Sequence, residues 1–134
     1  MSLPEPETLE LKTSEDIVRA RQRVRVCMKD QGFNLIDQTK MVTATSELAR
    51  NTVDYGLGGT MQIESLVDGG RIGIRLTFLD QGPGIPDIEL ALKDGYTSGH
   101  GLGLGLGGSK RLVNEFEIWS KPGDGTRVMV TRWR

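Results

Sequence analysis

Cysteine, histidine and aromatic residues are scarce in this sequence of 134 residues, which contains one cysteine, one histidine and 5% aromatic residues. The single cysteine, Cys27, has no partner for an intramolecular disulfide, and its apolar, helix-like neighbourhood indicates a packing role. One cysteine and one histidine are also too few to form the ligand pattern of a structural zinc site. The sequence therefore excludes a disulfide framework and a structural zinc site.

Long apolar runs, a charged leader and a strong net charge are lacking as well. Hydrophobic residues make up 37% of the chain, without a stretch long enough to span a bilayer. The first seven residues are acidic and rich in proline, unlike a signal peptide. The net charge of −1, without a basic stripe, argues against a nucleic-acid partner. We expect one cytoplasmic domain over residues 1–134, with neither membrane nor nucleic acid as a partner.

Glycine is abundant, and ten residues at 99–108 form an alternating run, Gly-His-Gly-Leu-Gly-Leu-Gly-Leu-Gly-Gly. Backbone N–H groups in such a run can close around an anion, and the leucines favour anchoring in a core over a free linker. The apolar spacing of residues 109–116 predicts a helix directly after the run. A dinucleotide fingerprint would need a strand immediately before it, and a Walker P-loop would need Gly-Lys-Ser/Thr, so the run predicts another kind of phosphate cradle.

A second glycine motif follows a predicted strand at residues 71–80. The strand delivers Asp80 to its end, where the breaker sequence Gln-Gly-Pro-Gly-Ile-Pro begins. Taken alone, this pattern describes a tight turn with an acidic cap about as well as it describes a site.

A predicted helix at residues 35–55 carries an apolar stripe and ends at Gly56. Glu47, Asn51 and Asp54 share one polar face beside that stripe, which for any one of them is most simply a solvated face. With the two glycine motifs, however, a carboxylate and a carboxamide one turn apart supply a proton acceptor and a metal-binding oxygen. Phosphoryl transfer from a magnesium nucleotide needs both groups.

Together these motifs resemble the ATP-binding fold shared by gyrase-type ATPases and histidine kinases, and within it the small serine kinases of sigma-factor partner switching. Residues 47–51 (Glu-Leu-Ala-Arg-Asn) correspond to the asparagine box of that family, residues 80–84 (Asp-Gln-Gly-Pro-Gly) to its first glycine box and residues 99–105 to its second. The Gly125-Thr126 pair matches the threonine that closes the adenine pocket. The resemblance covers nearly the whole chain, with four motifs in the right order.

The resemblance assigns a role to each matched residue. Asp80 would accept a hydrogen bond from the adenine amino group, which favours ATP over GTP, and Thr126 would complete that pocket. Asn51 would hold Mg²⁺, and Glu47 would be the catalytic base for a serine hydroxyl. The other nucleotide-binding positions implied are Gly82, Gly84, Gly101, Leu102, Gly103, Leu104 and Gly105.

Residues 94–99 and 110–118 are most similar to the switch kinases of the bacterial stressosome. That resemblance implies phosphorylation of STAS-domain scaffold partners and, on release, activation of a downstream phosphatase or cyclase. Two alternatives stay open: an anti-sigma factor with serine kinase activity, and a nucleotide-responsive module that sequesters a regulator without phosphate transfer.

The expected fold is a two-layer α/β sandwich, with a mixed, mostly antiparallel sheet and helices on one face. A first helix, opened by a capping box at residues 13–16 and running to about Asp30, carries five basic residues. These form either a solvated face or a docking surface for an acidic partner. The remaining expected elements are strands at 8–12, 59–67, 71–80, 116–120 and 127–133, and a short helix at 87–93.

Overall fold

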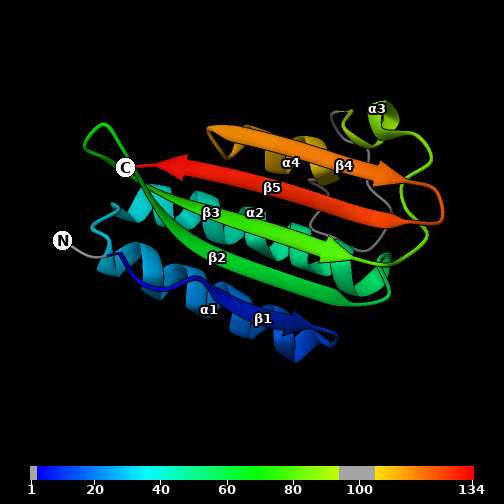
Figure 1. Cartoon of the computed structure of the whole chain (residues 1–134), viewed down its shortest axis with the longest axis horizontal. Helices are drawn as coiled ribbons and strands as arrows, with labels where there is room; N and C mark the ends of the chain where they lie inside the picture. Colours follow the sequence, from blue (N-terminus) through cyan, green and yellow to red (C-terminus); the bar gives the residue numbers. More distant parts are fainter. Residues whose placement is uncertain (1–2, 94–104) are drawn as a thin grey trace.

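A computed structural model describes residues 3–93 and 105–134. One five-stranded sheet and a layer of helices on a single face of it make up the fold (Figure 1). The strands have the order β1-β2-β3-β5-β4, and all four pairings are antiparallel. The expected two-layer α/β sandwich is confirmed. The predicted mixed sheet is not found within the described residues, where all four strand pairs are antiparallel. The β2–β3 and β4–β5 pairs are hairpins, and the longer connections, from β1 to β2 and from β3 to β5, also return the chain in the opposite direction.

The first half of the chain forms an edge strand and two long helices. Strand β1 (Glu7–Leu11) lies one residue before its predicted position and pairs with β2. Helix α1 (Ser14–Asp30) has Thr13 as its N-cap. The Thr13 hydroxyl accepts from the Asp16 backbone N–H, and the Asp16 carboxylate accepts from the Thr13 backbone N–H. The predicted capping box is thus confirmed. Helix α2 (Leu35–Asp54) crosses the sheet behind β2 and β3 (Figure 1).

Strands β2 (Gly59–Asp68) and β3 (Arg71–Asp80) form the hairpin that the sequence predicts. Its two-residue turn consists of Gly69 and Gly70, at φ 58° and 84°, a conformation that glycine adopts without steric cost. Strand β5 (Gly125–Trp133) then inserts between β3 and β4 (Glu115–Lys121), so the last strand of the chain lies in the middle of the sheet. Asp80 and Thr126 are consequently direct partners across β3 and β5.

The helix predicted at residues 109–116 is wrong in position. Helix α4 (Gly105–Arg111) begins inside the glycine run, and β4 already starts at Glu115. The apolar residues after position 111 therefore belong to the turn and strand rather than to a helix face. Between β3 and α4 lies helix α3 (Ile88–Ala91), shorter than the predicted 87–93.

The core lies between the sheet and helices α1, α2 and α4. Alternate residues of β2, β3 and β5 point toward the helices, and α1 and α2 meet them with residues three or four positions apart. None of the described helices combines the length and the apolar character that a membrane span requires. The fully buried large side chains include Leu11, Val24, Met28, Met41, Leu48, Met61, Ile74, Leu76 and Val130.

Candidate functional site

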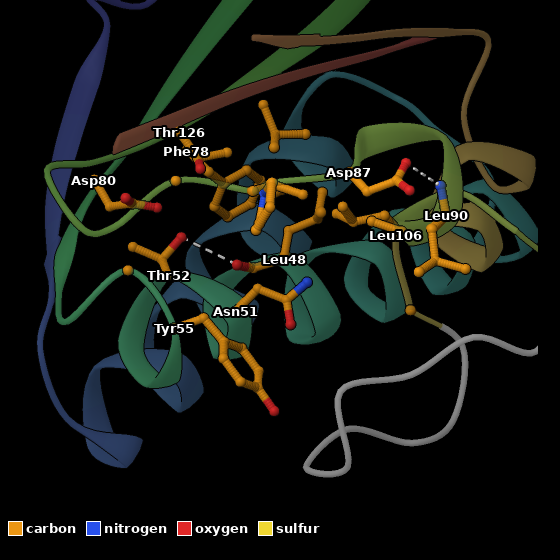
Figure 2. Close-up of a pocket in the computed structure, with 17 residues that line it drawn as sticks. Leu48, Asn51, Thr52, Tyr55, Phe78, Asp80, Asp87, Leu90, Leu106 and Thr126 are labelled. Atoms are coloured by element: carbon orange, nitrogen blue, oxygen red, sulfur yellow. Dashed lines mark hydrogen bonds between the residues drawn. The ribbon is translucent and has the colours of Figure 1, made fainter. Parts of the chain in front are cut away.

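A cavity of about 450 Å³ opens between α2, the ends of β3 and β5, and helices α3 and α4 (Figure 2). This volume falls in the range typical of small-molecule sites. Apolar side chains form most of its wall, and polar groups stand at a few points only. Its lining residues are Leu48, Asn51, Thr52, Tyr55, Gly56, Phe78, Asp80, Gly84, Ile85, Pro86, Asp87, Leu90, Ala91, Gly105, Leu106, Thr126 and Val128.

Asp80 is the buried carboxylate of this cavity, with 8% of its surface exposed at the end of β3. Its Oδ1 accepts a hydrogen bond from the Gly82 N–H at 2.9 Å. Burial raises the pKa of Asp80 above its usual value, while hydrogen bonds from the backbone N–H groups of Gly82 and Thr126 oppose that rise. A desolvated carboxylate with spare acceptor capacity is suited to a ligand that presents hydrogen-bond donors.

Gly56 makes room for this carboxylate, a role that the sequence reading missed. A Cβ on Gly56 would lie 2.4 Å from the Asp80 carboxyl carbon, and a Cβ on Gly82 would lie 2.7 Å from the Gly56 carbonyl oxygen. The two glycines therefore pack backbone against backbone beside Asp80. Gly56 looked like a helix terminator because its contact with residue 80 exists only in three dimensions.

Asn51 lines the cavity near the end of α2, one helical turn after Glu47 (Figure 2). Its backbone carbonyl accepts from the N–H groups of Tyr55 and Gly56 at 2.9 and 3.0 Å, which fixes the last turn of the helix. The Asn51 side chain thus extends from rigid backbone on the face of α2 that borders the cavity.

Glu47 does not lie on a solvated face, because only 3% of its surface is exposed. Its Oε1 accepts a hydrogen bond from the backbone N–H of Gly105, the first residue of α4, at 3.0 Å. Glu47, Asn51 and Asp54 do share one side of α2. Helix α4 covers Glu47, Asn51 borders the cavity, and Asp54 is exposed. The covering differs along the helix because α4 crosses only part of it.

The end of the glycine run is anchored in the core as the leucine pattern predicts. Leu106 is buried and lines the cavity, and Gly105 also borders it. Gly107 packs so closely against the chain after α3 that a Cβ would lie 2.3 Å from the Leu92 carbonyl oxygen. The predicted phosphate-binding residues Gly101, Leu102, Gly103 and Leu104 lie outside the described residues.

Thr126 lines the cavity as the direct cross-strand partner of Asp80 (Figure 2). Its hydroxyl lies 2.8 Å from that of Ser120 on β4. The Ser120 Oγ also accepts from the Ile85 N–H at 2.7 Å and donates to the Gly125 carbonyl at 3.0 Å. Ser120, which the sequence reading did not single out, thus joins β4, β5 and the segment after β3.

The two glycines of the first motif differ in what they do. Gly84, at φ 81°, borders the cavity, and a Cβ there would lie 2.3 Å from the Lys121 carbonyl oxygen. Gly82 contributes its N–H to Asp80 and is not among the described residues that line the cavity. The motif therefore shapes the turn around Asp80 as well as the cavity itself.

The polar groups suit a magnesium nucleotide. Asp80 and Thr126 are cross-strand partners in the wall of a largely apolar cavity. Asn51 and Gly105 also line it, and the Gly105 N–H donates to Glu47. No three Asp, Glu, His or Cys side chains of residues 3–93 and 105–134 form a metal site by themselves. A single amide oxygen, as in Asn51, fits an ion that takes most of its oxygens from phosphate and water, as Mg²⁺ does.

Comparison with known proteins decides the family. Residues 36–133 match the family described as histidine kinase-, DNA gyrase B-, and HSP90-like ATPase, and the matched span contains every lining residue of the cavity. The chain belongs to this ATPase family. ATP is therefore the nucleotide for which the family's cavity is built.

Relatives narrow the assignment within these ATPases. The chain is 45% identical to serine/threonine-protein kinase RsbT of Bacillus subtilis (strain 168) over 123 residues, which cover 92% of each protein. It is 32% identical to the anti-sigma F factor of Thermoanaerobacter sp. (strain X514) over 97 residues, 68% of this chain and 66% of that protein. The chain thus belongs to the partner-switching serine/threonine kinases among these ATPases.

Solved structures show the same fold at lower identity. The RsbU and RsbW domains of a Mycobacterium tuberculosis protein align with 98% of this chain at a TM-score of 0.68 and 21% identity, and the chain spans 33% of that protein. The mycobacterial sensor histidine kinase MprB aligns at a TM-score of 0.56 and 21% identity, and the alignment covers 96% of this chain and 97% of the MprB chain. Both likenesses concern the fold alone.

Proposed function

We propose that this protein transfers the γ-phosphoryl group of Mg²⁺-bound ATP to a serine or threonine of a STAS-domain partner. One observation carries the proposal: a single cavity is lined by the buried Asp80, by Asn51 and by Gly105, whose N–H donates to the Glu47 carboxylate. Asp80 suits a nucleotide base that presents a hydrogen-bond donor, whereas Asn51 and the backbone at Gly105 suit a metal ion and phosphate.

Binding of ATP would orient the reaction. Asp80 would accept from the adenine amino group, Thr126 would complete the base pocket, and Phe78 and Val128 would cover the ring. Asn51 would hold Mg²⁺, which neutralises charge on the phosphates when bound, and Gly82, Gly84 and residues 101–105 would shape the nucleotide cradle. Most of the rate enhancement would come from this positioning and charge stabilisation.

Glu47 would take the proton of the attacking hydroxyl. That oxygen forms a bond to the γ-phosphorus, the bond from phosphorus to the bridging oxygen breaks, and ADP leaves. A positioned base contributes about 10²- to 10⁴-fold. Glu47 holds the start of α4 through Gly105, so the same carboxylate lies next to the glycine motif proposed to bind the phosphates.

The partners that we propose follow from the relatives. The name of RsbT describes a serine/threonine kinase, and the name of the anti-sigma F factors describes regulators of a sigma factor. Both names are consistent with a protein that binds different protein partners in turn. The proposed sequence is phosphorylation of a stressosome STAS scaffold in the cytoplasm, release, and activation of a downstream phosphatase or cyclase. Kinase activity in an anti-sigma factor is the alternative within the same chemistry.

Incubation with labelled MgATP and a purified STAS-domain protein tests the proposal. Transfer of label to serine or threonine is expected from the wild-type chain and should be lost in Asn51→Ala, along with much of the MgATP affinity. Gln62→Ala is a matched control, because it removes a carboxamide from β2 that does not border the cavity. A tight ATP-dependent complex without transfer would instead identify a sequestering module.

A further inference from the structure

Ser120 lies outside the cavity wall but contacts three groups that shape it. It stands on β4, where its Oγ is within 2.7 Å of the Ile85 nitrogen, 3.0 Å of the Gly125 carbonyl oxygen and 2.8 Å of the Thr126 hydroxyl. A serine hydroxyl has one proton to donate and two lone pairs to accept with. These three contacts use that capacity completely.

Only one arrangement of the two hydroxyl protons makes all three contacts hydrogen bonds. The Ile85 N–H can only donate and the Gly125 carbonyl can only accept. Ser120 must therefore give its one proton to Gly125 and receive a proton from Thr126. Thr126 has then used its only proton, and only acceptor lone pairs are left on its oxygen for the cavity.

From this we infer that Ser120 is a specificity-determining positioning residue, which holds Thr126 as a pure hydrogen-bond acceptor in the nucleotide pocket. The inference rests on the proposed function, since it takes the part of the cavity at Asp80 and Thr126 as the base site. Both polar groups there are then acceptors. They suit the amino group of adenine and disfavour a purine with a carbonyl oxygen at the same position.

Removal of the Ser120 hydroxyl releases this constraint. In Ser120→Ala the Thr126 hydroxyl can rotate and donate to a ligand carbonyl, so discrimination between the two purines should fall. The Ile85 N–H and the Gly125 carbonyl also lose their partner. Ile85 has an apolar side chain, and Gly125 is not among the described residues that line the cavity, so this loss should weaken the affinity for both nucleotides equally. The ratio of the two affinities therefore isolates the effect on Thr126.

Calorimetric titration of the full chain with MgATP and with magnesium inosine triphosphate, which has a carbonyl in place of the amino group, tests the inference. The wild type should prefer ATP, and Ser120→Ala should reduce that preference by about three- to tenfold, the scale of one hydrogen bond. Ser120→Thr, which keeps the hydroxyl, should restore the wild-type ratio. An unchanged ratio in Ser120→Ala would overturn the inference.

Two further variants cover the remaining outcomes. If Ser120→Ala does not fold, Ser120→Cys fills similar space with a weaker donor and acceptor, and its ratio should fall in the same direction. In a Thr126→Val background, Ser120→Ala should leave the ratio unchanged, because the hydroxyl through which it acts is gone. Failure of the wild type to bind ATP would count against the proposed function, whereas binding without this change in ratio would count only against the role of Ser120.

Discussion

Asp80 is the residue at which burial and function oppose each other most clearly. The folded chain holds its carboxyl group out of water and raises its pKa, although two backbone N–H groups compensate in part. ATP binding as proposed needs the ionised acceptor. We expect the MgATP affinity to fall on acidification from about pH 7 to about pH 4, starting at a higher pH than an ordinary aspartate would cause. Calorimetric titrations across this range would measure it.

Asp80→Asn is the control for that pH dependence, because it cannot ionise at this position and reports the titration of the nucleotide and of the remaining protein groups. Stability should move in the opposite sense. A carboxyl group whose pKa is raised by folding destabilises the folded state above that pKa, and the penalty disappears as the pH falls toward its usual value. The free energy of unfolding of the wild type relative to Asp80→Asn should therefore rise on acidification. Parallel pH profiles for the two proteins would contradict this role for Asp80.

Glu47 combines two roles that different substitutions separate. Glu47→Gln keeps an oxygen for the Gly105 N–H but cannot accept a proton, so phosphate transfer should fall by about 10²-fold or more while MgATP binding persists. Glu47→Ala also removes the partner of Gly105, and it should lose ATP affinity in addition. Single-turnover transfer and equilibrium binding measure the two effects. Full transfer by Glu47→Gln would rule out a base at this position.

Among the elements, helix α4 depends on close backbone contact. Gly107 leaves no room for a side chain beside the Leu92 carbonyl. Gly107→Ala should push α4 away from the chain after α3 and weaken nucleotide binding, although alanine favours helix more than glycine does. The thermal unfolding midpoint and the MgATP affinity should both fall. Gly69→Ala is a comparison in an open turn, where no atom lies within 4 Å, and it should spare the affinity.

Helix α1 presents a basic face whose members differ in availability. Arg19 pairs with Asp16 at 2.7 Å and Arg23 with Glu7 at 2.8 Å. Arg21, Arg25 and Lys29 are exposed and form no ion pair within the described part of the chain, and they lie near the exposed Val18 and Val26. This face is suited to an acidic partner with some apolar surface.

Charge reversal tests that face. A double variant with Arg21→Glu and Arg25→Glu should slow association with a STAS-domain partner, by about tenfold or more at low salt and less at high salt. Stopped-flow association rates at two ionic strengths would show it. Lys40→Glu, on the exposed side of α2, changes the net charge elsewhere. An equal slowing per reversed charge in that variant would indicate a general field rather than a docking face.

For the molecule as a whole, the cavity joins elements that are far apart in the sequence. Its walls come from α2, β3, α3, α4 and β5, so only the folded chain presents it. MgATP at about 100 times its dissociation constant should stabilise the fold by about 2.7 kcal/mol, seen as a higher unfolding midpoint. Magnesium tripolyphosphate should stabilise it much less, because it leaves the apolar part of the cavity empty. Equal stabilisation by both ligands would contradict adenine binding in this cavity.

Local sequence signals predicted local structure well. The capping box at Thr13, the Gly69-Gly70 hairpin and the apolar stripes of the helices all depend on neighbours close in the chain. The predicted position of helix α4 was wrong because Gly105–Arg111, seven residues with three glycines, has little intrinsic helix preference. Contact with Leu92 and Glu47 holds this segment in a helix. Gly56 and Ser120 were missed for a related reason, since their partners are distant in sequence.

Patterns in the amino-acid sequence were enough to predict the order of the elements and the alternation that makes β2 and β3 strands. They also identified the chemically suited residues Glu47, Asn51, Asp80 and Thr126. Tertiary structure decided how those residues act, because burial and hydrogen-bond partners exist only after packing. It buried Glu47 beneath α4, placed Thr126 opposite Asp80 across two strands, and aligned Ser120 to orient the Thr126 proton. Side-chain chemistry is local to each residue, whereas desolvation and proton placement depend on every group that packs around it.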